Sequence, residues 1–414
     1  METREYRLGE LAKFSNGINF DKDAYFGNGI RLITVSDFGN NFSPDYESLI
    51  EVSNEVVKEK DLISKNDILF VRSNGNKELV GRCMLIDNVD KPTTYSGFCI
   101  KCHFDNENVS DPKYFTYYFK NQYFRKCISN ASGGTNIQNL NQEILSKHRV
   151  QLPPLPTQQK IASILSAYDN LIQNYKKQIE ALQTAASELY KEWFVRFRFP
   201  GWQNAKFENG LPVGWKYLKL SEFGYEVESG NRPAGGIDDS LEDGIPSLGA
   251  ESIDKLGYFD YSNVKLVPRE FYDKMKRGHG KDNDILLYKD GAYIGKVTLF
   301  RNDFPFKEYA VNEHVFLLRS INKNYQNYLY FTLNMPQYFT QMQNLNRNAA
   351  QPGLARGDLD RIKILVPDER AIERFNKFVN PLIENTFSHS KQITNLAKQR
   401  DLLLPRLMSG KLEV

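Results

Sequence analysis

The sequence predicts an α+β protein with two similar globular domains, each followed by a long helix. Three observations support this fold class: the second half of the chain repeats the first, a heptad pattern follows each copy, and short apolar runs alternate with polar turns inside each copy. A chain of 414 residues is long enough to build at least two domains with their own cores.

The repeat is clearest just before each long helix. Leu140, Leu145, Val150, Leu152 and Pro153 reappear without a gap, displaced by 214 residues, as Leu354, Leu359, Ile364, Val366 and Pro367. Upstream, RLGELAKFSNG from Arg7 resembles YLKLSEFGYEVESG from Tyr217, GIRLITVSDF from Gly29 resembles GIPSLGAESI from Gly244, and DILFVRSNGN from Asp67 resembles DILLYKDGAY from Asp284. The spacing slips by a few residues, as surface loops allow.

Each copy is predicted to mix strands with helices. The runs IRLITV, DILFV, DILLY and HVFLL are short, apolar and bounded by Gly, Asn and Asp, which is typical of buried strands. The run PKYFTYYFKNQYFRKCI from Pro112 is predicted to be helical.

A long helix is predicted after each copy. In the first, apolar residues recur at alternating steps of four and three, the spacing of a coiled-coil seam: Ile161, Leu165, Tyr168, Ile172, Tyr175, Ile179, Leu182, Ala186, Leu189 and Trp193. The equivalent positions of the second copy keep seven apolar residues and include Thr386, His389 and Arg400, which are expected either to set the helix register or to face solvent. Pro381 and Pro405 are expected to bend the second helix or to limit its ends.

These patterns divide the chain into four parts. We expect a first globular domain over 1–152, a first helix over 153–198, a connector and second globular domain over 199–366, and a second helix over 367–414. The connector, from Phe199, is rich in Gly, Pro and Asn. If the helices pair as an antiparallel coiled coil, the domains are related by a pseudo-twofold axis, and about 39 helical residues form a spacer of roughly 58 Å. That is somewhat under two turns of duplex DNA, at about 34 Å per turn.

Composition narrows the class of protein without identifying it. The net charge of +3 is too small to argue for nucleic acid by itself. No apolar run is long enough for a membrane helix and no secretory signal opens the chain, so we expect a cytoplasmic protein. Of the four cysteines, Cys99 and Cys102 have the spacing of a zinc site, but they lie in an expected strand, where positions three apart point to opposite faces. We therefore expect no metal.

The order of domain and helix, repeated twice, resembles the specificity subunit of type I restriction-modification enzymes. Four passages carry the resemblance: RLGELAKFSNG near the start, LNQEILSKHRVQLPPLPTQQKIASIL from Leu140, LPVGWKYLKLSE from Leu211, and LLLPRLMSGKLEV at the end. It covers essentially the whole chain. The second copy departs from this resemblance at PDERAIERFNKF, which lacks the Pro-Pro and Gln-Gln pairs of the first copy. The two helices could therefore bind their partners equally or unequally.

The resemblance implies a subunit that chooses a bipartite, asymmetric sequence in double-stranded DNA, with one half-site per target-recognition domain. It also implies two methyltransferase subunits as partners, which use S-adenosylmethionine to methylate adenine, and a possible restriction and translocation subunit. No cofactor is expected on this chain itself.

Candidate DNA-binding residues lie in two loops of each copy, because Arg, Lys, Asn and Gln on loops donate to phosphates and base edges. The loop after DILFV offers Arg72, Asn74, Asn76, Lys77 and Arg82, and its repeat offers Lys289, Tyr293 and Lys296. The segments SGGTNIQN and NRNAAQPGLARG, which precede the shared Leu pattern, offer Asn136, Gln138, Arg347, Asn348, Gln351 and Arg356. For any one of these residues the alternative is an ordinary solvated loop. Tyr168, Tyr175 and Trp193 are expected to pack in the seam rather than to stack on bases.

No catalytic motif emerges from the sequence. An adenine methyltransferase needs a glycine loop and an Asn or Asp followed by Pro-Pro and an aromatic residue, and neither FGNG from Phe26 nor the stretch from Asn380 supplies them. Asp111-Pro112-Lys113 ends like a nuclease motif but has no convincing upstream partner. We therefore expect a non-catalytic DNA specificity subunit. The alternative is a protein-protein scaffold whose helices only dimerise, with a single-chain nuclease ranking below both.

Overall fold

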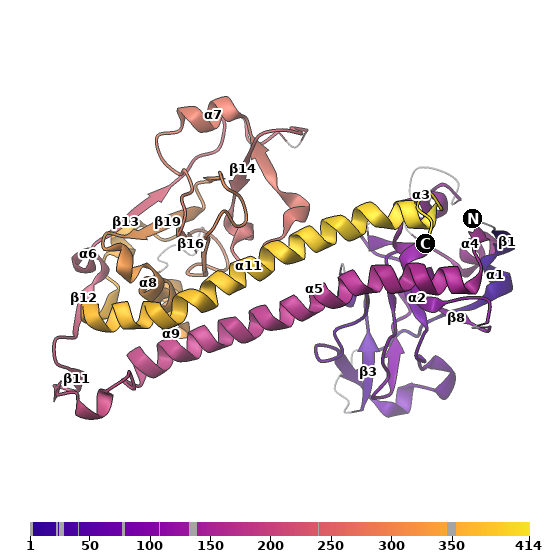
Figure 1. Ribbon diagram of the computed structural model, residues 1–414, viewed down its shortest axis with the longest axis horizontal. Coiled ribbons are helices and arrows are strands. Elements are labelled where there is room, and N and C mark those ends of the chain that lie inside the picture. Colours follow the sequence, from indigo (N-terminus) through magenta and orange to yellow (C-terminus); the bar gives the residue numbers. More distant parts are fainter. Residues whose placement is uncertain are drawn as a thin grey trace. The chain divides into compact units, whose positions relative to one another are not determined.

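The structure is a computed structural model that describes residues 3–21, 24, 29–39, 41–76, 79–106, 108–131, 139–238, 240–345 and 353–414. The chain divides into two compact units. The first unit combines Met1–Leu171 with Leu396–Val414, and the second is Ile172–Asn395. Each unit therefore holds one globular domain together with one end of each of two long helices (Figure 1).

The first globular domain contains nine strands and four helices within the described residues. The strands are β1 (Arg4–Arg7), β2 (Ala12–Asn16), β3 (Ile30–Ile33), β4 (Ile50–Val52), β5 (Ile68–Val71), β6 (Cys83–Leu85), β7 (Thr93–Tyr95), β8 (Cys99–Phe104) and β9 (Arg149–Leu152). The helices are α1 (Leu8–Leu11), α2 (Pro112–Lys120), α3 (Gln122–Ala131) and α4 (Gln142–Lys147). They form a four-stranded sheet in the order β2-β8-β5-β6, a three-stranded sheet in the order β4-β3-β7, and the pair β1-β9.

The four-stranded sheet separates two cores. Ile68 and Phe70 of β5 belong to the core that includes residues of α2, whereas Leu69 and Val71 belong to a second core with Ile33 of β3. Successive strand residues point to opposite faces, so a strand that reads as uninterrupted apolar sequence is buried on both sides.

Cys99 and Cys102 lie in β8, as the sequence predicted, and belong to different cores. Cys102 packs with the helix-side core and Cys99 with the core on the other face of the sheet. The prediction that Cys99 and Cys102 point to opposite faces of the strand is thus confirmed. Among the described residues, no group of three or more His, Cys, Asp or Glu side chains is placed to hold a metal ion.

The second globular domain repeats the first. Its strands are β10 (Phe207–Glu208), β11 (Leu211–Pro212), β12 (Lys216–Lys219), β13 (Tyr225–Ser229), β14 (Ile245–Leu248), β15 (Lys265–Val267), β16 (Ile285–Tyr288), β17 (Val297–Leu299), β18 (Ala310–Val311), β19 (Val315–Ser320) and β20 (Lys363–Val366). Its helices are α6 (Leu220–Phe223), α7 (Arg269–Lys274), α8 (Gln326–Leu333), α9 (Pro336–Asn344) and α10 (Arg356–Leu359).

The sheet orders of the two domains match strand for strand. In the second domain the four-stranded sheet has the order β13-β19-β16-β17, the three-stranded sheet the order β15-β14-β18, and the pair is β12-β20. The connector adds the small hairpin β10-β11. Even the mixture of directions is the same, because β3 pairs with β7 and β14 with β18 in parallel, while the remaining neighbours are antiparallel. The internal repeat read from the sequence is therefore a repeat of topology.

The glycine that ends the first repeated motif has the same role in both copies. A Cβ atom added to Gly17 would lie 2.3 Å from the carbonyl oxygen of Ser96, and one added to Gly230 would overlap the carbonyl oxygen of Val311 at 1.6 Å. Each glycine lets its chain pass against the main chain beyond the parallel edge strand. No other residue fits there without moving the backbone.

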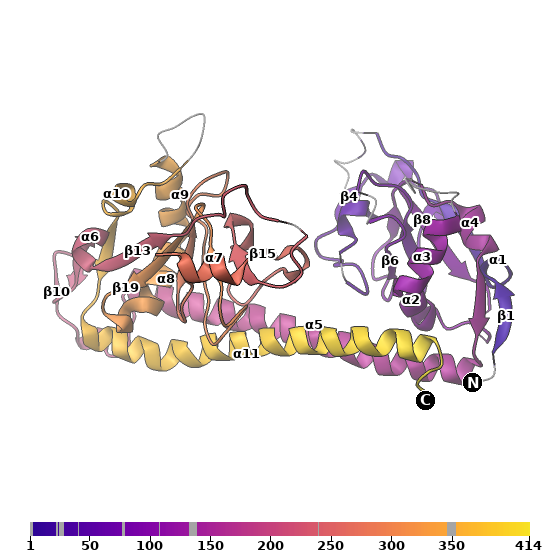
Figure 2. The same cartoon turned by 90° about the horizontal axis from the view of Figure 1, so that it is seen from above.

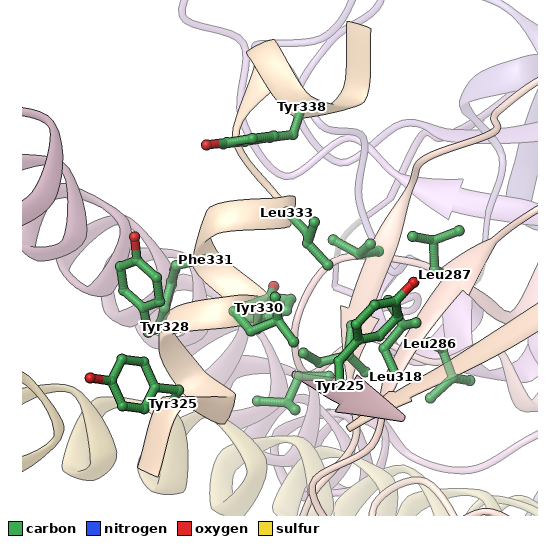
Figure 3. Packing of buried hydrophobic residues seen from close by; sticks show 14 of the residues in the cluster. Tyr225, Leu286, Leu287, Leu318, Tyr325, Tyr328, Tyr330, Phe331, Leu333 and Tyr338 are labelled. Atoms are coloured by element: carbon green, nitrogen blue, oxygen red, sulfur yellow. The ribbon is translucent and has the colours of Figure 1, made fainter. Parts of the chain in front are cut away.

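The helix α8 is buried along its whole length in the second core. All eight of its residues are buried. Figure 3 shows Tyr330 and Leu333 directed toward Leu286 and Leu287 of β16, with Tyr325 and Tyr328 on another side of the helix. A helix that is buried all round has no face for solvent, which explains its apolar and aromatic sequence.

The two long helices are α5 (Leu155–Tyr190), which continues as a π-helical turn over Lys191–Val195, and α11 (Glu369–Met408). They lie side by side in Figures 1 and 2. In the second unit Trp193 packs against Phe375 (ring centroids 5.9 Å apart) and Tyr175 against His389 (4.8 Å). In the first unit the guanidinium of Arg400 pairs with Asp169. Rising numbers in α5 meet falling numbers in α11, so the pairing is antiparallel.

The seam residues pack as the sequence predicted. Ile161, Ile172, Ile179 and Ala186 are buried, and Tyr175 packs between the helices instead of facing outward. The polar seam residues also make contacts: Thr386 donates to the carbonyl of Leu382 (2.9 Å), and His389 and Arg400 meet α5.

Neither proline interrupts the second helix. α11 runs through Pro381 and Pro405, so the expectation that they limit its ends holds only loosely for Pro405, which lies in the last turn. The side chain of Pro381 is exposed, where the missing hydrogen bond costs least because water reaches the freed carbonyl.

The fold class predicted from the sequence is confirmed: two similar α+β domains, each followed by a long helix, with the helices packed together. Within the described residues, no helix is both long enough and apolar enough to span a lipid bilayer.

Candidate nucleic-acid interface

In each domain the two predicted DNA-binding loops are joined by the main chain. In the first domain a β-bridge pairs Ser73 with Asn139, and the N–H of Leu140 donates to the carbonyl of Arg72 (2.8 Å). The loop after β5 and the segment before α4 lie more than 60 residues apart in sequence, yet they meet at this bridge.

The second domain repeats this bridge. Asp290 pairs with Gly353, and the N–H of Leu354 donates to the carbonyl of Lys289 (2.8 Å). The loop after β16 and the segment before α10 are thereby joined, as in the first domain. In both repeats the two candidate segments therefore meet at a main-chain bridge.

In the loop after β5 of the first domain, some side chains bond to their own domain and another is exposed. The guanidinium of Arg72 donates to the carbonyl of Gly97 (3.3 Å) and is half-buried. The side chain of Asn74 accepts from the N–H of Asn76 (2.8 Å), which forms a local turn and leaves Asn76 exposed at the tip. Arg72 therefore supports the base of the loop, whereas Asn76 is the side chain that faces outward.

Arg82 lies away from the loop tip. Its side chain lines a cavity of about 470 Å³ in the first unit, together with Tyr117, Lys120 and residues of the long helices. The sequence placed Arg82 with the DNA-binding loop because it follows the loop in the chain, but a turn at Gly81 redirects the backbone (φ +78°) before Arg82.

In the second domain Lys289 is held by its neighbours. Its ammonium group lies 2.7 Å from a carboxylate oxygen of Asp290 and 5.4 Å from the centre of the Phe316 ring. Its charge is therefore already compensated within the domain. Lys289, like its counterpart Arg72, supports the base of a loop.

Three further candidates of the second domain are more accessible. Tyr293 is 63% exposed, and Arg356, the first residue of α10, is exposed as well. Lys296 makes only a long surface ion pair with Asp254 (3.4 Å), which water and salt weaken. These side chains are available to a ligand such as a phosphate group.

Six of the predicted contact residues lie outside the described residues. They are Lys77, Asn136, Gln138, Arg347, Asn348 and Gln351.

Sequence reasoning missed a charged cluster beside the second bridge. The imidazole of His314 lies between two carboxylates, with Nδ1 3.2 Å from Asp290 and Nε2 3.3 Å from Glu313. Glu313 also pairs with Arg232 (3.2 Å). The signal in the sequence was the pair Glu313-His314, of which His314 opens the run HVFLL, directly before the strand β19. In the first domain the bridge residues are the neutral Ser73 and Asn139, so the two bridges differ in their side-chain chemistry.

Comparison with known proteins places these features in a family. A family model described as the type I restriction modification DNA specificity domain matches residues 1–184 and 212–399. The chain is 30% identical to the type I restriction enzyme MjaIX specificity subunit of Methanocaldococcus jannaschii, over 98% of this chain and 92% of that protein. It is 22% identical to the EcoKI specificity subunit of Escherichia coli, over 98% and 86%. A solved structure of a type I restriction-modification S subunit from M. genitalium shares the fold with a TM-score of 0.58 at 17% identity, covering 98% of this chain and 96% of that one.

Proposed function

The chain belongs to the type I restriction-modification DNA specificity family, and we propose that it reads a two-part DNA sequence with one half-site per globular domain. It is a DNA specificity subunit, which directs catalytic subunits and has no catalytic role of its own. The domain limits used in this proposal are 1–152 and 199–366, with the helical segments 153–198 and 367–414.

The observation that carries the proposal is the bridge that joins the two loops in each domain. A base pair is discriminated by several hydrogen bonds to its edge, so a reader needs side chains from more than one segment held in a constant relation. The pairs Ser73–Asn139 and Asp290–Gly353 supply that relation at the same place in both repeats. We assign the contacts to phosphates and bases to the loops carried by these bridges.

Within those loops we divide the roles by accessibility. Asn76, Tyr293, Lys296 and Arg356 are exposed or partly exposed and are proposed to contact DNA directly, as are the candidates at Lys77, Asn136, Gln138, Arg347, Asn348 and Gln351. Arg72, Asn74 and Lys289 are proposed to position the loops, because their side chains bind atoms of their own domain. Arg82 is left out of the contact set because it lines a cavity elsewhere in its unit.

The two half-sites are proposed to differ in sequence. Asp290 and Glu313 put carboxylates beside the second bridge, where Lys289, His314 and Arg232 bind them. A carboxylate oxygen can accept a further hydrogen bond from the amino group of cytosine. The first bridge carries neutral Ser73 and Asn139 instead. A twofold repeat of topology thus bears two surfaces of different chemistry, which suits an asymmetric target.

The partners follow from the family and the helices. We propose that two methyltransferase subunits bind the paired helices α5 and α11, that S-adenosylmethionine is bound by those subunits, and that a restriction subunit can join the assembly. The proposal has support in the exposed apolar side chains that the helices retain, Leu171, Phe378 and Leu402.

The test is a comparison of DNA methylation in cells that express this chain together with a methyltransferase subunit of its system and in cells that lack only this chain. Single-molecule sequencing should reveal a two-part adenine-methylated motif with a fixed gap in the first cells alone. Identical methylation patterns, with expression and methyltransferase activity verified, would contradict the proposal and favour a protein-protein scaffold.

A further inference from the structure

The cavity that contains Arg82 has the charge of an anion-binding site. Its walls come from the first unit alone, from α2 and α3 and from the parts of α5 and α11 that belong to that unit. Four cationic side chains line it, Arg82, Lys120, Arg125 and Arg400, against two carboxylates, Asp169 and Asp401. The lining therefore carries an excess of positive charge.

Both carboxylates are already occupied by Arg400. One oxygen of Asp169 accepts from the Arg400 guanidinium and the other from the hydroxyl of Tyr117 (2.5 Å). Asp401 accepts from Nε and a terminal nitrogen of Arg400, at 2.9 and 2.8 Å. Both carboxylates that line the cavity therefore bind Arg400.

Arg82 and Lys120 remain without a carboxylate. Among the described residues, none forms a hydrogen bond or an ion pair with the Arg82 guanidinium, and the Lys120 ammonium donates only to the carbonyl of Asn41 (2.8 Å). Burial lowers the pKa of Lys120, Cys83 and Asp169 act against this lowering, and the charges of Arg400 and Arg82 add to it. Burial also raises the pKa of the Cys83 thiol to about 11. An anion in the cavity would relieve this repulsion.

The size and walls of the cavity indicate what that anion is. A volume of about 470 Å³ falls in the range of small-molecule sites, roughly 300 to 1,000 Å³, and is far larger than a single phosphate ion needs. The walls include Phe42, Leu404 and Pro405, which suit an apolar or aromatic group, and reach down to the buried ring of Phe119.

We propose that this cavity binds a phosphate-bearing small molecule of nucleotide size, with its phosphates on Arg82 and Lys120. The site is separate from the bridged loops and lies against Asp169 and Arg400, the ion pair between the two long helices in this unit. A bound phosphate competes with Asp169 for Arg400, so occupancy is expected to affect the pairing of the helices.

The experiment is isothermal titration calorimetry of the full chain with ATP, pyrophosphate, inorganic phosphate and adenosine at about 0.15 M salt. ATP and pyrophosphate should bind and adenosine should not. Arg82→Gln should weaken ATP binding by at least about tenfold, as expected for the loss of a charge-assisted contact. The matched control is Arg370→Gln, which removes an exposed arginine in the first turn of α11 and should leave the affinity unchanged. Inorganic phosphate that binds as tightly as ATP would identify the free ion as the ligand and retain the anion site.

Two further measurements make the proposal falsifiable. Lys120→Met serves as a second variant if Arg82→Gln does not fold, as judged by its thermal unfolding. A duplex that contains the target sequence is added as competitor, because ATP bound to the cavity should not be displaced. The proposal is overturned if no anion binds, if both cavity variants bind ATP like the wild type, or if duplex displaces ATP, which would place the anion on the DNA-binding surface.

Discussion

Gln158, the first of the two glutamines that follow the prolines, holds two helix starts together through its side-chain amide. The side chain is completely buried, and its amide accepts from the N–H of Asp111 (2.9 Å) and donates to the carbonyls of Val109 (2.8 Å) and Pro153 (2.9 Å). Asp111 in turn caps α2 by accepting from the N–H of Tyr114 (2.7 Å). One side chain thus ties the start of α5 to the start of α2.

Gln158→Ala is expected to lower the free energy of unfolding by about 3 kcal/mol, because it leaves one buried and two part-buried main-chain groups without this partner. Urea unfolding followed by circular dichroism measures the change. The neighbouring Gln159 is exposed, so Gln159→Ala is a matched control that should have little effect. Equal stability of the two variants would contradict the structural role of Gln158.

His148 predicts a dependence of stability on pH. Its Nε2 atom lies 2.8 Å from the Tyr118 hydroxyl, and burial lowers its pKa. The unfolded chain therefore takes up a proton near the ordinary histidine pKa of about 6.5, while the folded chain resists it, so stability is lost as the pH falls below that value. Between about pH 7.5 and about pH 5.5, the wild type should lose more stability than His148→Gln in urea titrations. Parallel losses in the two proteins would show that another group is responsible.

The contacts that individual side chains make within their own domain were not predictable from the sequence. Arg82 and Lys289 were chosen because they are cations next to loops, but Arg82 lines a cavity and Lys289 is paired with Asp290. The position of Arg82 depends on the turn at Gly81, and that of Lys289 depends partly on Phe316, a neighbour that is distant in sequence. Local sequence carries no information on such contacts, because they form only when separate segments pack.

At the scale of elements, the pairing of α5 with α11 combines an apolar seam with one ion pair. The side chains of Asp169 and Arg400 are 13% and 21% exposed, so both charges are largely removed from water. Removing Asp169 leaves the Arg400 guanidinium with Asp401, whose side chain is 62% exposed, as its carboxylate partner. Loss of the buried partner alone should therefore cost more than removing both charges.

A double-mutant cycle tests this pair. Asp169→Leu alone should lower the free energy of unfolding by about 3 kcal/mol, and Arg400→Leu in the same chain should recover part of that loss. The four proteins are compared by urea unfolding. Additive losses would mean that the two side chains contribute independently to stability.

The continuity of α5 predicts the effect of breaking it. Leu182→Pro removes a helical hydrogen bond in the C-terminal half of the helix and clashes with the preceding turn, so it should abolish co-purification with the methyltransferase subunit. Leu182→Ala shortens the same side chain without breaking the helix and is the control. A Leu182→Pro chain that still folds and assembles would contradict a helical binding platform.

Helices and strands were predictable from the sequence where their apolar residues recur at a regular spacing. The seam of α5, the strands β5, β16 and β19, and the repeat of 214 residues all follow from apolar spacing. The course of α11 through Pro381 was not predictable, because whether a proline ends a helix depends on what surrounds it. The helix predicted from Pro112 is in fact α2 and α3, which meet at Asn121, a residue whose side chain caps the second of them.

At the scale of the whole molecule, the duplicated domain predicts separable specificities. Replacing Asn136 and Gln138 with Ala should alter the methylated motif in one half-site only, because the loop belongs to the first domain. Methylation mapping in cells gives both half-sites in one measurement. Methylation that is unchanged at both half-sites would contradict the assignment of this loop.

The first unit is assembled from both ends of the chain, since Leu407 lies in its core and Leu403, Leu404, Met408, Leu412 and Val414 pack against it. During translation these residues are made after every residue of the second unit. The second unit, Ile172–Asn395, is continuous and is synthesised whole before Leu396–Val414, whereas part of the apolar surface of the first unit stays uncovered until those residues are made. The domain made first is therefore the domain completed last, and a nascent chain that stalls before Leu396 has one finished unit and one that needs protection from aggregation.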